Sequence, residues 1–190
     1  MKKFRIIAIT PPLFFPEEVS RITEILDSGE ADFVHIRKPN ATSREITELI
    51  TQLPQRLHYR LKIHDHFQLL EEFSLAGVHL NSRNPKAPLK NISISKSLHS
   101  LEELSDAHEF DYATLSPIFD SISKKGYRAK FDYQELREHL KGKENIIALG
   151  GVTPEKFPLL RSLGFSGAAL LSHFFHPQYL ILNTQTPKPA

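Results

Sequence analysis

Short runs of β-branched and apolar residues recur along the chain, separated by segments in which apolar residues follow a helical spacing. Several runs are apolar at consecutive positions, which is typical of strands buried on both faces of a parallel sheet. The pattern predicts eight strands, at residues 5–9, 33–37, 61–65, 77–80, 92–97, 112–118, 146–149 and 168–171.

Helical patterns fill most of the gaps between these runs. From Ile46 to Leu53, apolar residues recur at i, i+3, i+4 and i+7, which predicts an amphipathic helix. Thr42-x-x-Glu45 in front of it has the form of a capping box, and Ser100-x-x-Glu103 has the same form. In all, the pattern predicts six or seven helices, among them 19–29 (ended by Gly29), 153–164 (from Thr153-Pro154 to Gly164) and 173–182.

Eight βα units in one chain favour the α/β class and a single, compact (β/α)₈ TIM barrel. The chain of 190 residues is shorter than the usual minimum of about 200, so its units must be trimmed. The stretch between Leu80 and Ile92, which contains two prolines, has room for only a short helical turn. An open doubly wound sheet with fewer strands is the alternative. We expect one barrel domain over residues 1–183 and a loose polar tail at 184–190.

Composition narrows the possible functions. The chain has no cysteine, which excludes disulfides, thiol catalysis, Fe–S clusters and Cys-ligated zinc. Its 24 Lys and Arg against 22 Asp and Glu give no reason to expect a nucleic-acid or membrane partner. Neither a membrane span of about 20 apolar residues nor a secretory h-region is present, so we expect a cytoplasmic protein. The sequence leaves the oligomeric state open, a homo-oligomer included.

Polar side chains follow the carboxyl ends of four successive predicted strands. In a barrel these ends form the working face. Strand alternation places His35 and Arg37 on one face and Lys38 on the other. A ring of Arg, Lys and His suits an anionic ligand, most simply a phosphate. The residues concerned are His35, Arg37, His64, Asp65, His66, His79, Ser97 and His99.

Two later segments predict the same chemistry. Residues 121–126, with two hydroxyls and two ammonium groups, have the composition of a phosphate or diphosphate cradle, although a mobile surface loop would read the same way. Gly150-Gly151 follows the seventh strand and precedes a capped helix, where backbone N–H groups and the helix dipole favour an anion. Ser172 ends the eighth strand, and barrels frequently bind phosphate after strands seven and eight.

Several blocks of the sequence carry a resemblance to a known family. They are residues 76–80 (AGVHL), 110–119 (FDYATLSPIF), 121–124 (SISK), 147–152 (IALGGV), and 164–167 (GFSG) before Leu171-Ser172. In content and spacing the chain resembles the thiamine-phosphate synthase (thiamine-phosphate pyrophosphorylase) and thiazole tautomerase family over residues 5–174.

The resemblance implies a (β/α)₈ barrel that joins an aminopyrimidine diphosphate to a thiazole phosphate in thiamine biosynthesis, releasing diphosphate with help from Mg²⁺. Its partners are then small phosphorylated substrates. The implied catalytic residues are Ser97 and Lys124, and the implied metal residues are Asp65 and Asn84. The implied substrate-binding residues are His35, Arg37, His64, Ser121, Ser123, Lys124, Gly151, Leu171 and Ser172.

The chain departs from the family pattern on its pyrimidine and metal side. His35 replaces a glutamine, and Pro39 replaces a lysine for which Lys38 is the candidate substitute. His64 replaces an asparagine and His66 an arginine. Asn84 stands where the family has its second metal-binding aspartate, which predicts weakened Mg²⁺ binding because the amide lacks the charge.

Two other functions fit parts of the sequence. The chain could be a relative without synthase activity, either a thiazole tautomerase or a non-catalytic binder of thiazole or thiamine phosphate. The tautomerase branch uses a histidine where this chain has Pro117, so His35, His64 or His99 would have to act as the base. A metal-dependent hydrolase is the third reading, with His64, His66, His79, His99 and Asp65 as ligands for zinc or nickel.

Overall fold

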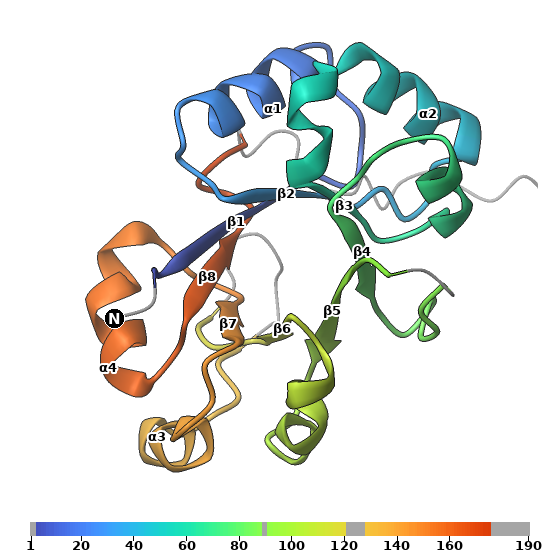
Figure 1. Ribbon diagram of the computed structural model, residues 1–190. Helices are drawn as coiled ribbons and strands as arrows, with labels where there is room; N and C mark the ends of the chain where they lie inside the picture. Colours follow the sequence, from blue (N-terminus) through green and yellow to red (C-terminus); the bar gives the residue numbers. More distant parts are fainter. Residues whose placement is uncertain (1–2, 89–90, 121–127, 176–190) are drawn as a thin grey trace, which may run out of the picture.

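The computed structural model contains a closed barrel of eight parallel strands that follow one another in chain order (Figure 1). The structure describes residues 3–88, 91–120 and 128–175. Pairing of the first strand with the last closes the ring and confirms the predicted barrel over the open sheet. The strands are β1 (Arg5–Ile9), β2 (Phe33–Ile36), β3 (Leu61–Ile63), β4 (Gly77–Leu80), β5 (Ser93–Leu98), β6 (Tyr112–Leu115), β7 (Ile146–Leu149) and β8 (Gly167–Leu170).

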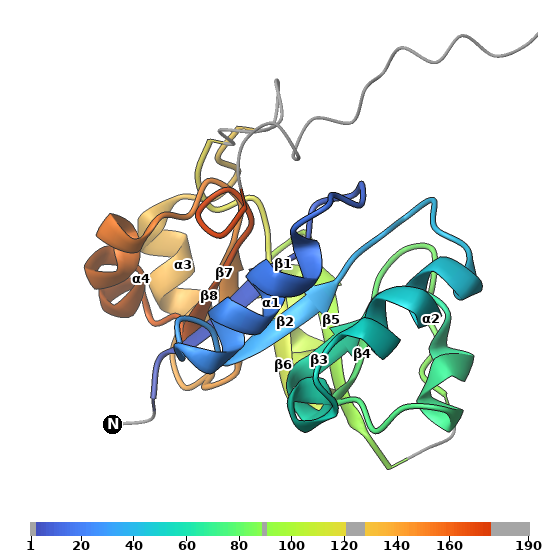
Figure 2. The same ribbon diagram turned by 90° about the horizontal axis from the view of Figure 1, so that it is seen from above.

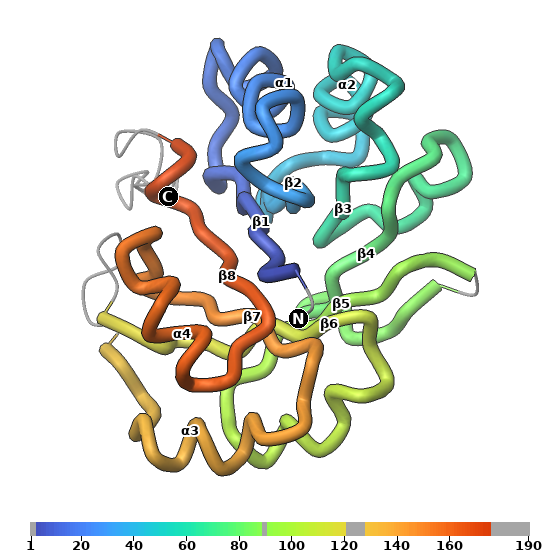
Figure 3. The backbone as a smooth tube through the Cα atoms, turned by 60° about the vertical axis from the view of Figure 1, so that its left-hand side comes forward, coloured from blue at the N-terminus to red at the C-terminus, as the bar shows by residue number. Residues whose placement is uncertain are grey.

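The outer layer is trimmed, as the chain length requires. The helices α1 (Glu18–Asp27) and α2 (Ser43–Gln52) lie outside β1–β3, whereas α3 (Tyr133–Leu140) and α4 (Phe157–Leu163) lie beside β7 and β8 (Figure 2). Between β4 and β5 the described residues form a loop without a helix, and a 3₁₀ segment follows β5 (Figure 3). The 3₁₀ segments are η1 (Gln55–Arg60), η2 (Phe67–Glu71), η3 (Glu102–Glu109) and η4 (Pro154–Lys156).

The described residues therefore hold four α-helices rather than six or seven, and 3₁₀ segments replace the others. Residues 81–88 form bends and no helical turn. Residues 171–175 form a turn at the start of the expected helix 173–182; the rest of that helix, and the tail 184–190, lie outside the described residues. No helix of the described part is long and apolar enough to cross a membrane.

One of the two predicted capping boxes is confirmed. The Thr42 hydroxyl accepts a hydrogen bond from the Glu45 N–H, and the Glu45 carboxylate accepts one from the Thr42 N–H at 2.7 Å. The second box is wrong. The η3 segment begins after Leu101, and the Glu103 carboxylate accepts from the His99 N–H at 2.6 Å, so it fixes the end of β5 instead of a helix start.

The barrel interior has an apolar half and a polar half. A cluster of Ile7, Ile9, Ile147 and Ala169 fills the side of β1, β7 and β8, with Tyr112 at its edge. On the side of β2–β5, the strand registers place His35 beside Lys62 and His79 beside Ser95, all fully buried. The larger apolar core lies between the strands and the outer helices. Buried polar groups on this scale must be hydrogen-bonded to be tolerated, which makes the polar half the place to look for a site.

Candidate functional site

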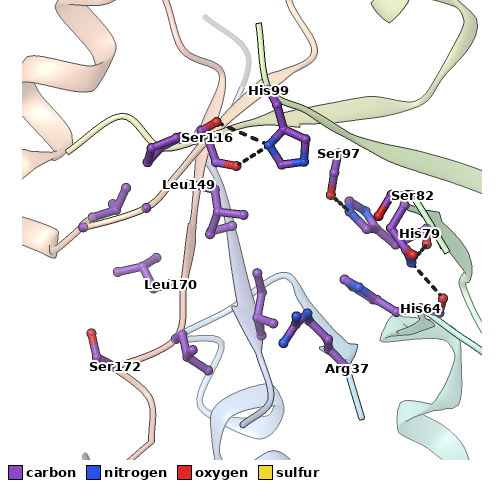
Figure 4. A pocket seen from close by; sticks show the side chains of 18 of the residues that line it. Arg37, His64, His79, Ser82, Ser97, His99, Ser116, Leu149, Leu170 and Ser172 are labelled. Atoms are coloured by element: carbon purple, nitrogen blue, oxygen red, sulfur yellow. Dashed lines mark hydrogen bonds between the residues drawn. The ribbon is translucent and has the colours of Figure 1, made fainter. Parts of the chain in front are cut away.

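A cavity of about 330 Å³ opens at the carboxyl ends of the strands. Figure 4 shows Arg37, His64, His79 and Ser97 along one side of it and Leu149 and Leu170 along the other. The cavity thus continues the two halves of the barrel interior, with polar groups from β2–β5 facing apolar ones from β7 and β8. Such a mixture suits a small ligand with an aromatic and an anionic part.

Arg37 and Lys38 have opposite orientations, as strand alternation predicts. Arg37 lines the cavity, and its backbone N–H donates to the Thr10 hydroxyl at 2.9 Å. Lys38 points away from the barrel axis, and its ammonium lies 2.6 Å from the Glu18 carboxylate of α1. Lys38 Nζ also donates to the Leu13 carbonyl at 2.7 Å. The expectation that Lys38 stands in for the lysine replaced by Pro39 is therefore wrong, because this ion pair is buried outside the barrel.

His35 and His64 form one hydrogen-bonded chain with Tyr112. His35 Nε2 lies 2.5 Å from the Tyr112 hydroxyl, and His35 Nδ1 lies 3.0 Å from His64 Nε2. Burial lowers the pKa of both histidines well below the ordinary value and raises the pKa of the Tyr112 phenol. The imidazoles are therefore neutral and the phenol protonated near pH 7. Only His64 of the three lines the cavity, and His35 lies behind it.

His79 is held between two serines on the neighbouring strand. Ser95 Oγ donates to the Val78 carbonyl at 3.2 Å, so it accepts from His79 Nδ1 at 2.9 Å. His79 Nε2 is then an acceptor and takes the hydroxyl proton of Ser97 at 2.8 Å. Burial, helped by the charges of Lys62 and Arg37, lowers the pKa of His79 to about 3. Ser97 therefore presents its oxygen to the cavity as a hydrogen-bond acceptor.

The histidines that the structure brings together differ from those predicted for a hydrolase. Nitrogen atoms of His35, His64 and His79 lie within 4.8 Å of one another and could hold a metal ion. His66 instead turns back in a left-handed conformation, with Nε2 2.7 Å from the Ala41 carbonyl. His99 lies beside Ser116, with its Nδ1 3.3 Å from the Ser116 hydroxyl (Figure 4). Both ring nitrogens of His35 and of His79 already have hydrogen-bond partners, so the described geometry is that of a polar network.

Asp65 and Asn84, the two predicted metal residues, are in contact but do not fit a Mg²⁺ site. Asn84 Nδ2 donates to Asp65 Oδ1 at 2.6 Å and to the His64 carbonyl at 3.2 Å. Arg83 Nη2 lies 3.2 Å from each oxygen of the same carboxylate. Mg²⁺ requires oxygen ligands directed at one point, whereas here N–H donors occupy the Asp65 carboxylate.

Glycine geometry shapes the far side of the cavity. Gly150 and Gly151 have φ of 93° and 60°, a region that side chains disfavour. A Cβ on Gly151 would lie 2.1 Å from the Asp120 carbonyl oxygen, so the loops after β6 and β7 touch here. Gly151, Leu171 and Ser172 all line the cavity, as does Ser97. Of the other predicted residues, Ser121, Ser123 and Lys124 lie outside the described residues.

Three residues at or beside this site were missed by the sequence reasoning. Arg83 follows the predicted polar end of β4 by three positions, in a loop that shows no periodic pattern. Tyr112 and Lys62 stand at inward positions of β6 and β3, a parity that strand alternation gives once the register is known. Lys62 Nζ lies 4.4 Å from the Tyr112 ring centre and has no hydrogen-bond partner among the described residues; burial lowers its pKa to about 7.

Comparisons with known proteins agree with this geometry. A family model described as thiamine monophosphate synthase matches residues 6–174. A "Putative thiamine-phosphate synthase 2" of Aquifex aeolicus is 30% identical over 183 residues, covering 90% of this chain and 97% of the relative. The "Thiamine-phosphate synthase" of Pediococcus pentosaceus is 26% identical and covers 81% of this chain and 79% of its own.

The solved structures give the same result. A crystal structure described as thiamine phosphate pyrophosphorylase from Bacteroides thetaiotaomicron superposes with a TM-score of 0.78 at 36% identity, covering 89% of this chain and 83% of that one. The barrel, the cavity at its carboxyl end and these matches together assign the chain: it belongs to the thiamine monophosphate synthase family.

Proposed function

We propose that this protein is a thiamine-phosphate synthase, a transferase that joins 4-amino-2-methyl-5-pyrimidinylmethyl diphosphate to a thiazole phosphate. One observation carries the proposal beyond family membership. Arg37 after β2, Gly151 after β7 and Ser172 after β8 are far apart in sequence, yet they line the same cavity. A cavity that brings these groups together supports a reaction between two phosphorylated substrates, each of which needs a group to bind its anion.

The proposed reaction exchanges one bond for another. The C–O bond between the pyrimidine methylene and diphosphate breaks, and diphosphate leaves with the electron pair. The thiazole nitrogen then donates its lone pair to the methylene cation, forming the C–N bond of thiamine phosphate. No proton is transferred in either step. The protein has to stabilise charge on the leaving group and to align the nitrogen with the cation.

Each half of the cavity has a role in this scheme. The Arg37 guanidinium would bind the diphosphate, together with Ser121, Ser123 and Lys124, whose roles rest on the family resemblance. Ser97, an acceptor because it donates to His79, would take a hydrogen bond from the 4-amino group of the pyrimidine. Backbone groups at Gly151 and the Ser172 hydroxyl would hold the thiazole phosphate.

Mg²⁺ has no assigned place in this scheme. Synthases of this family generally depend on Mg²⁺. The Asp65 and Asn84 side chains do not fit the ion as they stand, so no step is routed through it.

A steady-state assay of thiamine phosphate formation from both substrates tests the proposal. We expect product with the intact chain and a loss of roughly 100-fold in kcat/KM for Arg37→Ala, since about 3 kcal/mol of charge-assisted hydrogen bonding is removed. Arg56→Ala is the matched control, because Arg56 is exposed and pairs with Asp27 at 2.8 Å, away from the cavity. Absence of product, with and without Mg²⁺, would refute the proposal.

One observation favours a second candidate, a family member that binds thiazole phosphate without synthase activity. His35, in place of the glutamine that the resemblance assigns to substrate binding, is fully buried and does not line the cavity. Calorimetry separates the two functions. A binder or a tautomerase takes up thiazole phosphate with no measurable uptake of the pyrimidine diphosphate, whereas a synthase binds both. For a tautomerase, His99 is the candidate base, because its Nδ1 lies 3.4 Å from the carbonyl of Ser116, the residue before Pro117; His99→Asn should abolish turnover.

A further inference from the structure

The loop after β4 presents a cation at the place where the family resemblance predicts a metal. Arg83 lines the cavity, and its Nη2 contacts both oxygens of Asp65 at 3.2 Å. The carboxylate is largely buried, with 16% of its side chain exposed, while 44% of the Arg83 side chain is exposed. A guanidinium has several N–H donors, and Nη2 alone serves Asp65, so the remaining donors are available to a ligand.

The position of Arg83 is fixed by its own loop. The Asn81 side-chain oxygen accepts from the Arg83 N–H at 3.0 Å and from the Asn84 N–H at 3.3 Å. The Asn81 amide in turn donates to the His64 carbonyl at 3.0 Å. These hydrogen bonds hold the loop at the end of β3. The backbone of Arg83 is therefore fixed, and this fixed backbone helps to place the guanidinium.

Asn84 completes an arrangement that excludes a divalent ion. Its amide nitrogen faces two acceptors, the His64 carbonyl and the Asp65 carboxylate, which fixes the nitrogen and turns the amide oxygen away from them. A metal between Asp65 and Asn84 would require this amide to flip, with loss of both hydrogen bonds. It would also have to displace the Arg83 cation from Asp65.

The charge of the cavity supports the same conclusion. Arg37 and Arg83 both line it, and no Asp or Glu is found among the described residues that do. Two guanidinium groups therefore face the cavity, and the Asp65 carboxylate next to it is paired with Arg83. Such a wall attracts a diphosphate and repels a divalent cation.

We propose that the Arg83 guanidinium, held by Asp65, takes the place of the metal ion and binds the diphosphate directly. Asp65 is then a positioning residue for Arg83 and no metal ligand. That the ligand is a diphosphate rests on the proposed function. That the loop supplies a cation rests on the geometry of residues 81–84. The protein should accordingly bind diphosphate without a divalent metal.

Calorimetric titration of the full chain with inorganic pyrophosphate tests this, once in EDTA and once in Mg²⁺. We expect binding in EDTA and no gain in affinity on adding Mg²⁺. Arg83→Ala should weaken binding in EDTA by roughly tenfold or more, as expected for losing a charge-assisted contact. Arg56→Ala should have no effect. A requirement for Mg²⁺ in the unaltered chain would overturn the proposal.

Asp65→Asn gives the sharper comparison, because the two roles of Asp65 predict opposite results. A metal ligand lost to asparagine abolishes only the binding that needs Mg²⁺, whereas a positioning residue lost to asparagine weakens the binding in EDTA, by no more than Arg83→Ala does. Arg83→Ala leaves the Asp65 carboxylate without its partner, whereas the double variant Arg83→Ala/Asp65→Asn leaves no lone charge. Thermal unfolding of the two variants therefore shows whether a loss of binding comes from misfolding or from the lost contact with pyrophosphate. Binding in EDTA that is unchanged in Asp65→Asn, with loss of the binding that needs Mg²⁺, would refute the proposal.

The outcomes also separate this proposal from the proposed function. Thiamine phosphate formed only with Mg²⁺ would uphold the synthase and refute the role of Arg83. Metal-free pyrophosphate binding that depends on Arg83, without product, would uphold the anion site and refute the synthase.

Discussion

Lys38→Met tests whether the second cation after β2 acts in folding or in ligand binding. Lys38 Nζ lies 2.6 Å from Glu18 Oε1, with 0% and 2% of the two side chains exposed. The Phe14 ring centre lies 4.6 Å from the same nitrogen. The ammonium group is therefore enclosed between the start of α1 and the loop before it, on the outer side of the barrel.

The cost of this change follows from the burial of its partner. Burial raises the pKa of Glu18 and lowers the pKa of Lys38, and the attraction between the two opposes both shifts. Removing one member of a buried pair leaves an uncompensated charge and costs about 3–5 kcal/mol of unfolding free energy. At about 2–4 °C per kcal/mol for a chain of this size, Tm should fall by roughly 6–20 °C. The double variant Lys38→Met/Glu18→Leu should recover most of this, because an apolar pair needs no partner charge.

Differential scanning calorimetry at pH 7 gives Tm, and pyrophosphate titration well below Tm gives the affinity of the folded protein. We expect Lys38→Met to lower Tm and leave the affinity unchanged. Lys3→Met is the matched control, since Lys3 pairs with Asp32 but keeps 81% of its side chain exposed; it should cost less than about 1 kcal/mol. A Tm as high as that of the control, together with weaker pyrophosphate binding, would refute the reasoning and return Lys38 to the site.

Two further predictions concern the buried histidine and the glycine pair. The pKa of His79 is about 3 in the folded chain and near 6.5 in the unfolded chain, so below about pH 6 the unfolded chain binds one more proton. The free energy of unfolding should therefore fall with pH, by up to about 1.4 kcal/mol per pH unit. Urea unfolding between pH 7 and 4.5 should show a shallower decline for His79→Gln. Gly151→Ala should lower the free energy of unfolding more than Gly142→Ala does, and it should raise KM for thiazole phosphate. Both glycines have a positive φ, but of the two only Gly151 has a neighbour within 4 Å of an added Cβ. Equal free energies of unfolding for the two variants would contradict this.

The strands were the most predictable part of the molecule. Residues 5–9, 77–80 and 146–149 were predicted as strands with the ends that the structure has. Others were predicted too long at the carboxyl end: the sixth strand stops at Leu115, two residues before Pro117, which has no N–H for the ladder. A buried parallel strand is marked by its own apolar residues, so a local pattern is enough to find it.

Helices and caps were harder because tertiary contacts decide them. Ser100-x-x-Glu103 has the same form as the confirmed box at Thr42, yet the Glu103 carboxylate bonds to the His99 N–H instead. Residues 102–109, after β5, form the 3₁₀ segment η3 although their pattern predicts an ordinary helix. Such a choice depends on contacts with the rest of the barrel, which no local window contains.

The candidate site shows the same division between local and tertiary information. Alternation along β2 was enough to bring Arg37 to the cavity and to send Lys38 outward. The partner of Asp65 could not be predicted from the sequence, because Asp65 follows β3 and Arg83 contacts it from the loop after β4. The position of Asp65 in the sequence predicts a metal ligand, whereas the guanidinium that pairs with it follows only from the tertiary structure.

Neighbouring cations of this chain thus act in opposite ways, and strand parity explains why. In a buried parallel strand, a one-residue shift exchanges the cavity face for the helix face. Arg37 contributes charge to a ligand cavity, whereas Lys38, one residue later, contributes charge to the contact with α1. A lysine lost at position 39 could not have been replaced from position 38 without breaking this pair. Among the described residues that line the cavity, the cation besides Arg37 is Arg83, which comes from the loop after β4 and not from β2.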